Sequence, residues 1–287
     1  MTKILKGAEV VEAMNAEVAA SVESLSAAGV VPTLAILRVG ERGDNIAYER
    51  AVAKRAEKVG VAVKNVVLPE EASGEAVLQA VENLNTDEGV HGVLMLRPLP
   101  KHIDESFVRN TLNPKKDVDG ITDLSLSGVF TGIDTGYAPC TAQACMDILD
   151  FFGYDLQGKR AIVVGRSLVV GKPAAMMLLD RHATVTVAHS RSVDLATRCR
   201  ESDVIIACVG AAHMIDADCL APGQIIVDVG INVAEDGSLV GDVDFAAADG
   251  LVDAISPVPG GVGTVTTSVL LKHVTHAATK SVGCHCE

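Results

Sequence analysis

The sequence predicts an α/β protein of two domains, an N-terminal α/β domain and a C-terminal Rossmann-type domain with a parallel sheet. Three observations favour this fold. The chain has 287 residues, which fits two domains of roughly 100–200 residues each. Strand-length runs rich in Val and Ile alternate with amphipathic segments, as in parallel sheets covered by helices. A stretch rich in Gly and Asp, residues 115–140, divides this alternation into two regions.

In the first region, apolar residues at helical spacing alternate with short buried runs. We expect helices over 8–28, 45–59 and 74–84 and strands over 33–39, 61–68 and 92–96. Glycines follow several of these elements, for example Gly40 and Gly60, and glycine commonly ends helices and strands. Residues 115–140 are too irregular for core elements, so we expect a loop and place the domain boundary there.

The second region repeats the alternation after a predicted linker helix over 142–152. We expect strands over 160–164, 183–188, 203–208 and 225–229, with a helix after Pro173. A last helix over about 266–278 is expected to pack back on the first domain. The predicted domains are therefore residues 1–140 with 266–287, and residues 141–265.

Composition excludes several kinds of partner. The formal net charge of -13 argues against nucleic acid, because binding phosphates requires a basic surface. The apolar runs are shorter than the roughly 20 residues of a membrane-spanning helix, so no membrane association is expected. Seven scattered cysteines lack the spacing of a disulfide framework and predict a reducing, cytoplasmic location. The adjacent Cys284, His285 and Cys286 cannot alone close a tetrahedral site, so no metal is expected.

A dinucleotide site is predicted at the end of the strand over 160–164. Gly165 allows a tight turn and Gly171 a close backbone approach, while free N–H groups and the dipole of the next helix favour a pyrophosphate. The spacing departs from G-x-G-x-x-G, so a plain strand-to-helix turn is the alternative. The next strand ends in His189-Ser-Arg-Ser192 without the acid typical of NAD sites. Arg191, with Arg166 and Ser190, instead suits the extra phosphate of NADP, although these arginines could simply be solvated and NAD is possible.

Eight motifs in order resemble the methylenetetrahydrofolate dehydrogenase/cyclohydrolase family of folate one-carbon metabolism. They are Tyr48 in its helix, Arg97-Pro-Leu-Pro100, Lys116-Asp-Val-Asp-Gly120, Pro139-Cys-Thr141, Gly165-Arg-Ser167 with Gly171-Lys-Pro173, Val227-Asp-Val-Gly-Ile-Asn232, Gly241-Asp-Val243 and Pro257-Val-Pro-Gly-Gly-Val-Gly263. The likeness covers nearly the whole chain. It implies a folate-binding first domain completed by the C-terminal helix, a homodimer, and hydride transfer from 5,10-methylenetetrahydrofolate to NADP.

The resemblance also implies roles for individual residues. Tyr48 and Asp119 are expected to be catalytic, with Asp119 on the pterin ring. The residues expected to bind substrate are Tyr48, Leu96, Pro98, Asp119, Pro259, Gly260 and Gly261. Those expected to bind the cofactor are Gly165, Arg166, Ser167, Gly171, Ser190, Arg191, Gly210, Gly230, Ile231 and Thr266. The bland alternatives are that Asp119 caps the bend before Gly120 and that Tyr48 is a core residue of an amphipathic helix.

Two departures from the family pattern concern a second reaction. Bifunctional members of the family have Lys four residues after the Tyr, where this chain has Val52. Their G-x-x-V-Q-L-P-L-P motif becomes Gly92-Val-Leu-Met-Leu-Arg-Pro-Leu-Pro100, so Leu96 replaces Gln. Hydride transfer needs alignment more than a protein acid or base, whereas cyclohydrolysis calls for a positioned proton carrier. We therefore expect a dehydrogenase whose cyclohydrolase activity is lost or weak.

Two other hypotheses remain open at the level of sequence. The enzyme could keep both activities, with Lys54, Arg55 or Arg97 replacing the missing Lys. By helical geometry Lys54 points away from the face of Val52, and Arg55 lies nearer in angle but a turn too far. The protein could also be a non-catalytic sensor that binds NADP, but the folate-side motifs argue against that reading.

Overall fold

The structure is a computed structural model that describes residues 1–283. Cys284, His285 and Cys286 therefore lie outside the described residues. The chain forms two compact units, one of residues 1–12 and 141–266 and the other of residues 13–140 and the chain from Thr267 on. We call them the six-stranded unit and the three-stranded unit after their main sheets. Among residues 1–283, no helix is both long enough and apolar enough to cross a membrane.

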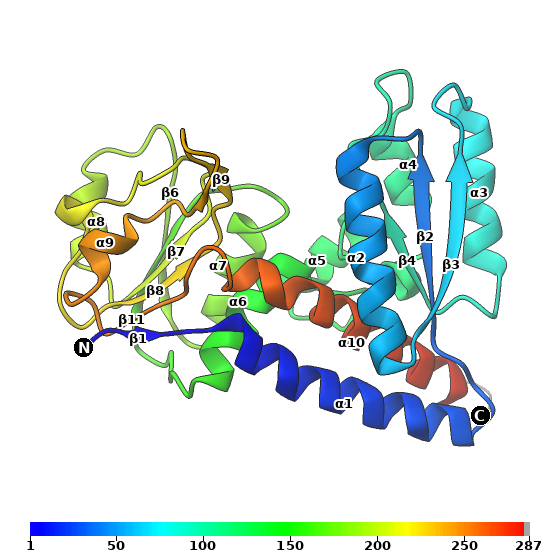
Figure 1. Cartoon of the computed structure of the whole chain (residues 1–287), viewed down its shortest axis with the longest axis horizontal. Helices are drawn as coiled ribbons and strands as arrows, with labels where there is room; N and C mark the ends of the chain where they lie inside the picture. The colour runs from blue at the N-terminus through cyan, green and yellow to red at the C-terminus, as the bar shows by residue number, and fades with distance from the viewer. Residues whose placement is uncertain (284–287) are drawn as a thin grey trace. The chain divides into compact units, whose positions relative to one another are not determined.

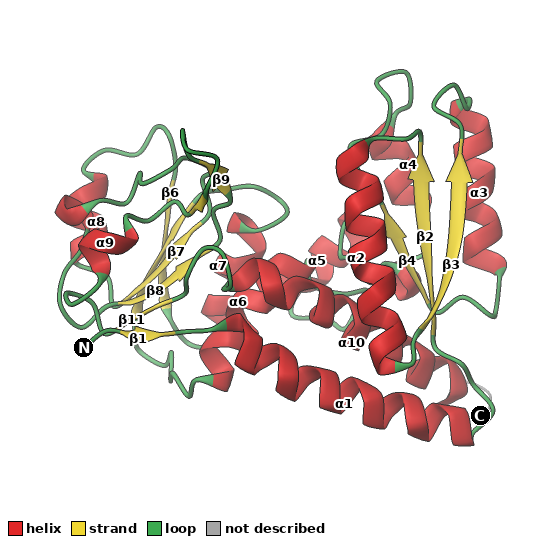
Figure 2. Ribbon diagram, in the orientation of Figure 1, coloured by secondary structure: helices red, strands yellow, loops and turns green. Residues whose placement is uncertain are grey.

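The three-stranded unit is built on a parallel sheet of order β3-β2-β4 (Figure 2). Its strands are β2 (Thr33–Val39), β3 (Ala62–Leu68) and β4 (Gly92–Met95), and its helices include α2 (Gly43–Val59), α3 (Gly74–Thr86), α4 (Glu105–Thr111), a 3-10 turn η1 (Pro114–Lys116) and α5 (Asp123–Thr131). Most of α1 (Gly7–Ala27) and of α10 (Val262–Gly283) also belongs to this unit. The two helices are joined there by a hydrogen bond from Ser268 Oγ to Asn15 Oδ1 of 2.9 Å. The last helix thus packs on α1 within this unit, which agrees with the expectation that it packs back on the first domain.

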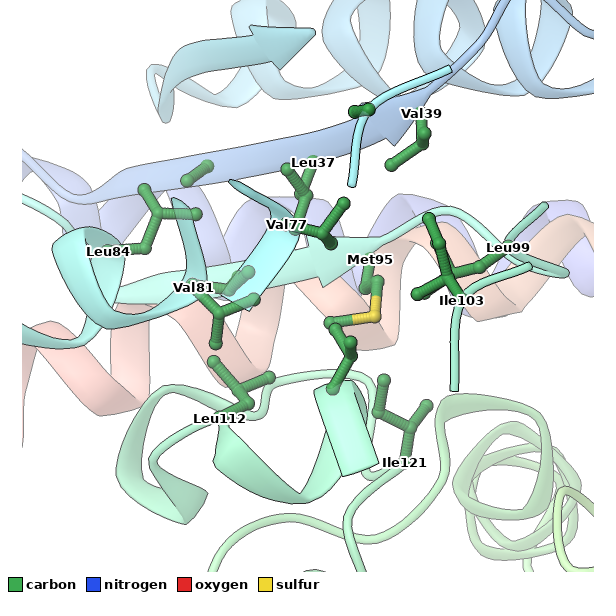
Figure 3. Packing of buried hydrophobic residues seen from close by; sticks show 14 of the residues in the cluster. Leu37, Val39, Val77, Val81, Leu84, Met95, Leu99, Ile103, Leu112 and Ile121 are labelled. Carbon is green, nitrogen blue, oxygen red and sulfur yellow. The ribbon is translucent and has the colours of Figure 1, made fainter. Parts of the chain in front are cut away.

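One face of this sheet forms a core with α3 and α4 (Figure 3). Leu37 of β2 and Met95 of β4 meet Val77 and Val81 of α3, and Leu112 follows α4. Each such side chain contributes about 1.5–3 kcal/mol when fully buried. This core fixes the carboxyl ends of β2 and β4, from which the loops of the first candidate site leave.

The expectation that residues 115–140 form a loop without core elements is wrong, because α5 lies within them. The Thr122 hydroxyl caps this helix by accepting the N–H of Ser125 at 3.1 Å, and Gly132 ends it in a left-handed conformation. A side chain at Gly128 could not fit, because its Cβ would lie 2.3 Å from the carbonyl oxygen of Thr135. The helix is signalled by its caps rather than by an apolar period, which is why the pattern of residues alone missed it.

The six-stranded unit has the sheet order β1-β11-β8-β7-β5-β6, all parallel (Figure 1). Its strands are β1 (Lys3–Ile4), β5 (Arg160–Val164), β6 (Thr184–Ala188), β7 (Val204–Ala207), β8 (Ile225–Asp228) and β11 (Ala254–Ile255), with a separate antiparallel pair of β9 (Asn232–Val233) and β10 (Leu239–Val240). Its helical segments are α6 (Cys140–Phe151), α7 (Gly171–Asp180), α8 (Leu195–Arg200), η2 (Ala217–Cys219) and α9 (Phe245–Ala248).

Two features of this sheet were not predicted from the sequence. The first twelve residues join this unit rather than the other, because Lys3 and Ile4 pair with Ala254 and Ile255. The order in which strands are added to the sheet also reverses at β5, because β6 pairs with β5 on one side and β7 pairs with it on the other. At such a switch point, the loops leave the carboxyl ends of neighbouring strands in opposite directions and open a crevice for a ligand.

Candidate functional site

The first candidate site lies in the three-stranded unit and begins with the two acids of the Lys116–Gly120 segment. Asp117 is fully buried, and its carboxylate accepts hydrogen bonds from the N–H of Ile121 at 3.0 Å, the N–H of Thr122 at 2.8 Å and Ser125 Oγ at 2.6 Å. Asp117 therefore caps this bend, the role that the sequence left open for Asp119. Its oxygens are committed to the loop and are not available to a ligand.

Asp119 is half-buried beside this cap. Loss of hydration raises the pKa of its carboxyl to about 6, and the negative charge of Asp117 adds to the rise. The positive charge of Arg97 and a hydrogen bond from the Cys140 thiol oppose it. A carboxylate with a pKa near neutrality and a partly open face suits the recognition of an N–H-bearing ligand.

Tyr48 stands on α2 and is 39% exposed, which excludes the core reading. Burial of its hydroxyl, and then the negative charges of Asp119 and Cys140, raise the pKa of the phenol. A hydrogen bond with Thr267 of α10 and the charge of Arg55 act in the opposite direction. The phenol, Asp119 and Cys140 thus influence one another electrostatically and belong to one site.

The positions of the two departures from the family pattern are apolar and sealed. Val52 is 0% exposed and Leu96 is 3% exposed, so neither offers a polar group. Lys54 is exposed on another part of α2. Arg55 is half-buried and donates from Nη1 to Ser268 Oγ at 3.3 Å. Helical spacing placed Arg55 a turn too far from Tyr48, yet its long side chain brings the charge within range of the phenol.

The segment after β4 adds a second arginine. Arg97 is half-buried and its Nη1 lies 3.4 Å from Glu105 Oε1, while Glu105 Oε2 accepts the N–H of Leu99 at 2.9 Å. The peptide between Arg97 and Pro98 is cis, and Pro98 is exposed. Sequence reasoning gave Arg97 no place in the site beyond that of a possible substitute for Lys.

The second candidate site lies in the six-stranded unit, at the switch point of its sheet. Gly165 has a φ of 134°, and a Cβ there would lie 2.4 Å from the carbonyl oxygen of Cys208. A Cβ on Gly171 would lie 2.3 Å from the carbonyl oxygen of Gly165. Both glycines are thus required by close backbone packing. Ser167 Oγ accepts the N–H of Val170 at 3.1 Å, so this candidate ligand for the cofactor also holds its own loop.

The basic residues predicted for this site follow two paired strands. Val164 of β5 and Ala188 of β6 are register partners, so Arg166 and Arg191 leave the same edge of the sheet. Arg166, Arg191 and Ser190 are all exposed. The turn that carries Arg191 is fixed by a hydrogen bond from the His189 N–H to Ser192 Oγ of 3.0 Å. Two exposed guanidinium groups beside a glycine loop suit a phosphate-bearing ligand.

Two buried acids, which the sequence reasoning quoted in motifs but gave no role, brace the same edge. Asp242 is 0% exposed and accepts the N–H groups of Val209, Gly210 and Ala211 at 2.6, 3.0 and 2.9 Å. Asp228 accepts the N–H of Gly230 at 2.9 Å, and burial raises the pKa of its carboxyl to about 6. The only signal in the sequence was the pair of motifs Val227–Asn232 and Gly241–Val243.

Several predicted residues line a pocket of about 200 Å3 in this unit. Its lining comprises Asp228, Val229, Gly230, Ile231, Leu239, Pro257, Val258, Pro259, Gly260, Gly261, Val262, Gly263 and Thr264. Gly230, Ile231, Pro259, Gly260 and Gly261 were all predicted to touch substrate or cofactor. Thr266 lies outside this lining, and its hydroxyl donates to the carbonyl oxygen of Gly263 at 3.2 Å. Gly210 is exposed beyond β7, on the loop that Asp242 holds.

Comparison with known proteins gives two family models that match most of the chain. Residues 5–119 match the model described as "Tetrahydrofolate dehydrogenase/cyclohydrolase, catalytic domain". Residues 139–282 match the model described as "Tetrahydrofolate dehydrogenase/cyclohydrolase, NAD(P)-binding domain".

Individual relatives are similar over nearly their whole length. The chain is 44% identical over 279 residues to the "Bifunctional protein FolD" of Carboxydothermus hydrogenoformans, covering 96% of this chain and 97% of the relative. The crystal structure of the bifunctional enzyme FolD from Campylobacter jejuni matches with a TM-score of 0.95 at 34% identity, over 98% of this chain and 99% of that one. A Trypanosoma brucei methylenetetrahydrofolate dehydrogenase-cyclohydrolase, complexed with NADP cofactor and inhibitor, matches with a TM-score of 0.91 at 33% identity, over 98% of both chains.

Proposed function

Because this chain belongs to the tetrahydrofolate dehydrogenase/cyclohydrolase family, we propose that it oxidises 5,10-methylenetetrahydrofolate to 5,10-methenyltetrahydrofolate with NADP. The observation that carries this proposal is that Tyr48 and Asp119 lie close enough in the three-stranded unit for the charge of Asp119 to raise the pKa of the Tyr48 phenol. The Asp119 carboxylate accepts N–H groups of the pterin ring, and Tyr48 offers an aromatic face with a polar tip to the substrate.

The residues of the six-stranded unit fit a nicotinamide dinucleotide with an extra phosphate. The backbone of the Gly165–Gly171 loop takes the pyrophosphate, and Arg166 and Arg191 take the 2′-phosphate. The pocket lined by Gly230, Ile231 and the Pro259–Gly261 turn takes the nicotinamide end. When bound, NADP supplies the acceptor for the hydride. NAD remains a weaker candidate, since no acid follows β6 within His189–Ser192.

The first reaction asks little acid–base chemistry of the chain. The folate nitrogens supply the electrons that expel the hydride, so the residues of the site bind, orient and exclude water. Tyr48 keeps its proton at neutral pH because the pKa of its phenol is raised. Asp119, with a pKa of about 6, is mostly ionised at pH 7 and holds the substrate by accepting hydrogen bonds.

For the second reaction, the names of the relatives favour the bifunctional alternative over our expectation of a lost or weak cyclohydrolase. The sealed Val52 and Leu96 remain the argument for weakness, since they leave no lysine beside Tyr48. A bifunctional enzyme would need another group for hydrolysis, and Arg55 and Arg97 are the half-buried cations near Tyr48 and Asp119. A guanidinium stabilises charge but does not transfer protons near neutral pH.

We also propose a homodimer in the cytoplasm. On the antiparallel pair β9 and β10, Val233 is 71% and Leu239 is 44% exposed, an apolar edge that a second copy could cover. Light scattering should give the mass of a dimer, and Val233→Asp should shift it toward that of the monomer. Cys140, Cys145, Cys199, Cys208 and Cys219 form no disulfide among the described residues.

The deciding experiment is a dehydrogenase assay with 5,10-methylenetetrahydrofolate and either cofactor. We expect reduction of NADP with a kcat/KM higher than that for NAD. Asp119→Asn should abolish most activity while leaving NADP binding intact. If wild type binds NADP but neither turns over nor binds tetrahydrofolate, the non-catalytic sensor would replace this proposal.

A further inference from the structure

Arg97 places a positive charge at the carboxyl end of β4, in a segment of this chain, Met95–Pro100, that is otherwise apolar. It is half-buried and lies between the buried Leu96 and the exposed Pro98. A half-buried arginine loses hydration, so its retention needs a partner of opposite charge. Glu105 is one partner, but its contact with Arg97 Nη1 is long, at 3.4 Å.

Helix α4 holds the segment with Arg97 and the segment after Asp119 on residues one turn apart. Glu105 contacts Arg97 and the N–H of Leu99. Four residues on, Arg109 donates from Nη1 to the carbonyl oxygen of Ile121 at 2.5 Å and from Nη2 to Asp123 Oδ1 at 2.7 Å. Residues four apart share one helix face. The same short helix therefore holds the carboxyl end of β4 and the loop that begins with Asp119 in fixed positions relative to each other.

Within residues 1–283, the groups that act on Asp119 come from several elements, and one of them is a cation. Asp117 faces it from its own loop, Cys140 from the start of α6, and Tyr48 from α2. Asp117 cannot relax its repulsion of Asp119 easily, because three hydrogen bonds hold its carboxylate in place. The positive charge acting on Asp119 is that of Arg97. Without Arg97, Asp119 would face the charge of Asp117 in a partly dehydrated loop, with the Cys140 thiol as its hydrogen-bond donor among the described residues.

We propose that Arg97 is a positioning residue of the folate site, which keeps the Asp119 carboxylate charged and oriented toward the N–H groups of the substrate. Glu105 holds the guanidinium at the carboxyl end of β4, and the guanidinium in turn offsets the charge of Asp117. This inference rests on the proposed dehydrogenase function, because the substrate is the group that Asp119 would recognise. It assigns Arg97 to the binding of substrate rather than to proton transfer in hydrolysis.

The test is the pH profile of kcat/KM for 5,10-methylenetetrahydrofolate, measured in wild type and Arg97→Leu. Removing one opposite charge raises the pKa of a neighbouring acid by about one unit or more. A shift from about 6 to about 7 would lower kcat/KM roughly five-fold at pH 6 and by less than about 1.2-fold at pH 8. Arg97→Lys keeps the charge and should hold the acid limb near its wild-type position.

Matched variants separate this role from a general loss of structure. Lys101→Leu removes an exposed positive charge from the same loop and should leave the profile in place. Arg97→Gln removes the charge but keeps a long polar side chain, and it serves if Arg97→Leu does not fold, as judged by its thermal midpoint. Asp119→Asn should abolish the acid limb altogether.

The experiment distinguishes failure of the role proposed for Arg97 from failure of the proposed dehydrogenase function. A wild-type enzyme that turns over, together with a superimposable profile for folded Arg97→Leu or Arg97→Gln, overturns the role of Arg97. A wild-type enzyme without dehydrogenase activity overturns the proposed function, and with it this inference. A higher-pH acid limb in the neutral variants and a wild-type limb in Arg97→Lys support both.

Discussion

Asp228 accepts a hydrogen bond from the backbone N–H of Asp242 at 3.0 Å, and this contact links the loops after β7 and β8. Asp242 holds the loop after β7 through Val209, Gly210 and Ala211, and Asp228 holds Gly230 after β8. Two buried carboxylates thus shape this edge of the sheet, and Asp228 also lines the pocket there.

Asp242→Asn should destabilise the protein and weaken NADP binding. In wild type the backbone N–H donors share two carboxylate oxygens, whereas the amide of the variant offers them one acceptor oxygen. A buried donor left without its acceptor costs about 1–3 kcal/mol. We expect a loss of that order in the free energy of unfolding in urea and a higher KM for NADP. Asp236→Asn, which removes an exposed acid from the turn between β9 and β10, is the matched control. Equal stability of the two variants would contradict this account.

Gly165→Ala should abolish NADP binding. Its φ of 134° strains any other residue, and the added Cβ would lie 2.4 Å from the carbonyl oxygen of Cys208. Gly158→Ala is a useful comparison, since Gly158 also has a positive φ but no atom within 4 Å of a Cβ. That control should lose about 1–2 kcal/mol of stability and keep its affinity for NADP, measured by calorimetry.

Arg191→Gln should narrow the preference for NADP over NAD. Charge-assisted hydrogen bonds to a phosphate are worth about 1.5–3 kcal/mol, or a factor of about 10 to 100 in the ratio of the two kcat/KM values. Arg198, which lies in α8 and donates to the carbonyl oxygen of Val193, provides a nearby arginine whose replacement should leave that ratio unchanged. An unaltered ratio in Arg191→Gln would exclude this residue from the phosphate site.

Val52→Lys with Leu96→Gln should raise hydrolysis of methenyltetrahydrofolate relative to the dehydrogenase rate. A positioned acid–base group contributes about 10²–10⁴-fold, so a gain of at least about ten-fold is expected if wild type is weak. The single Val52→Lys serves as comparison, because it buries an ammonium without the amide beside it and should unfold more readily. A wild-type hydrolysis rate equal to its dehydrogenase rate, with no gain in the double variant, would show that other residues perform the second reaction.

Stability should fall in mild acid because of His273. Burial lowers the pKa of its ring to about 4, from about 6.5 in the unfolded chain, and its Nδ1 donates to the carbonyl oxygen of Val118 at 2.8 Å. A depressed pKa means that the unfolded chain takes up the proton first, so the stabilisation present above pH 6.5 is lost as the pH falls toward 4. The loss should be about 2 kcal/mol, allowing for partial exposure of the ring.

His273→Gln keeps a donor and removes the titration, so its unfolding free energy should change less between pH 7 and pH 4.5. His102→Gln replaces an exposed histidine of the same unit and should keep the wild-type slope. Identical slopes in all three proteins would refute the assignment to His273.

The strands β2 to β8 and the helices α1, α2, α3, α6 and α7 followed from periodicity and from terminal glycines, because those signals are local. The short strands β1 and β11 were not predicted. The segment after Lys115 could not be read in this way. Helix α5 depends on the cap at Thr122 and on the space that Gly128 leaves for a distant carbonyl oxygen. Neither feature has an apolar period, so the same residues read as loop.

For the site, sequence motifs identified which residues to consider, and local chemistry explained the glycine loop and the arginines near it. The division of labour between neighbouring residues came only from the tertiary structure. Asp117 and Asp119 are two residues apart and look equivalent in sequence, yet one caps a bend and the other is left for a ligand. The positions of the Arg97 and Arg55 side chains likewise depend on contacts with Glu105 and Ser268, respectively, which lie on other elements.

The sequence by itself thus determined the two α/β regions and the family and predicted the dinucleotide loop, since these rest on residue spacing along one stretch of chain. Only the tertiary structure decided that residues 1–12 complete the six-stranded sheet and which carboxylates are consumed by backbone donors. It also decided which charges reach Asp119 and Tyr48. The physical reason is that strand pairing, hydration and electrostatic interaction depend on distances in space. Those distances are set jointly by residues that lie far apart in the chain.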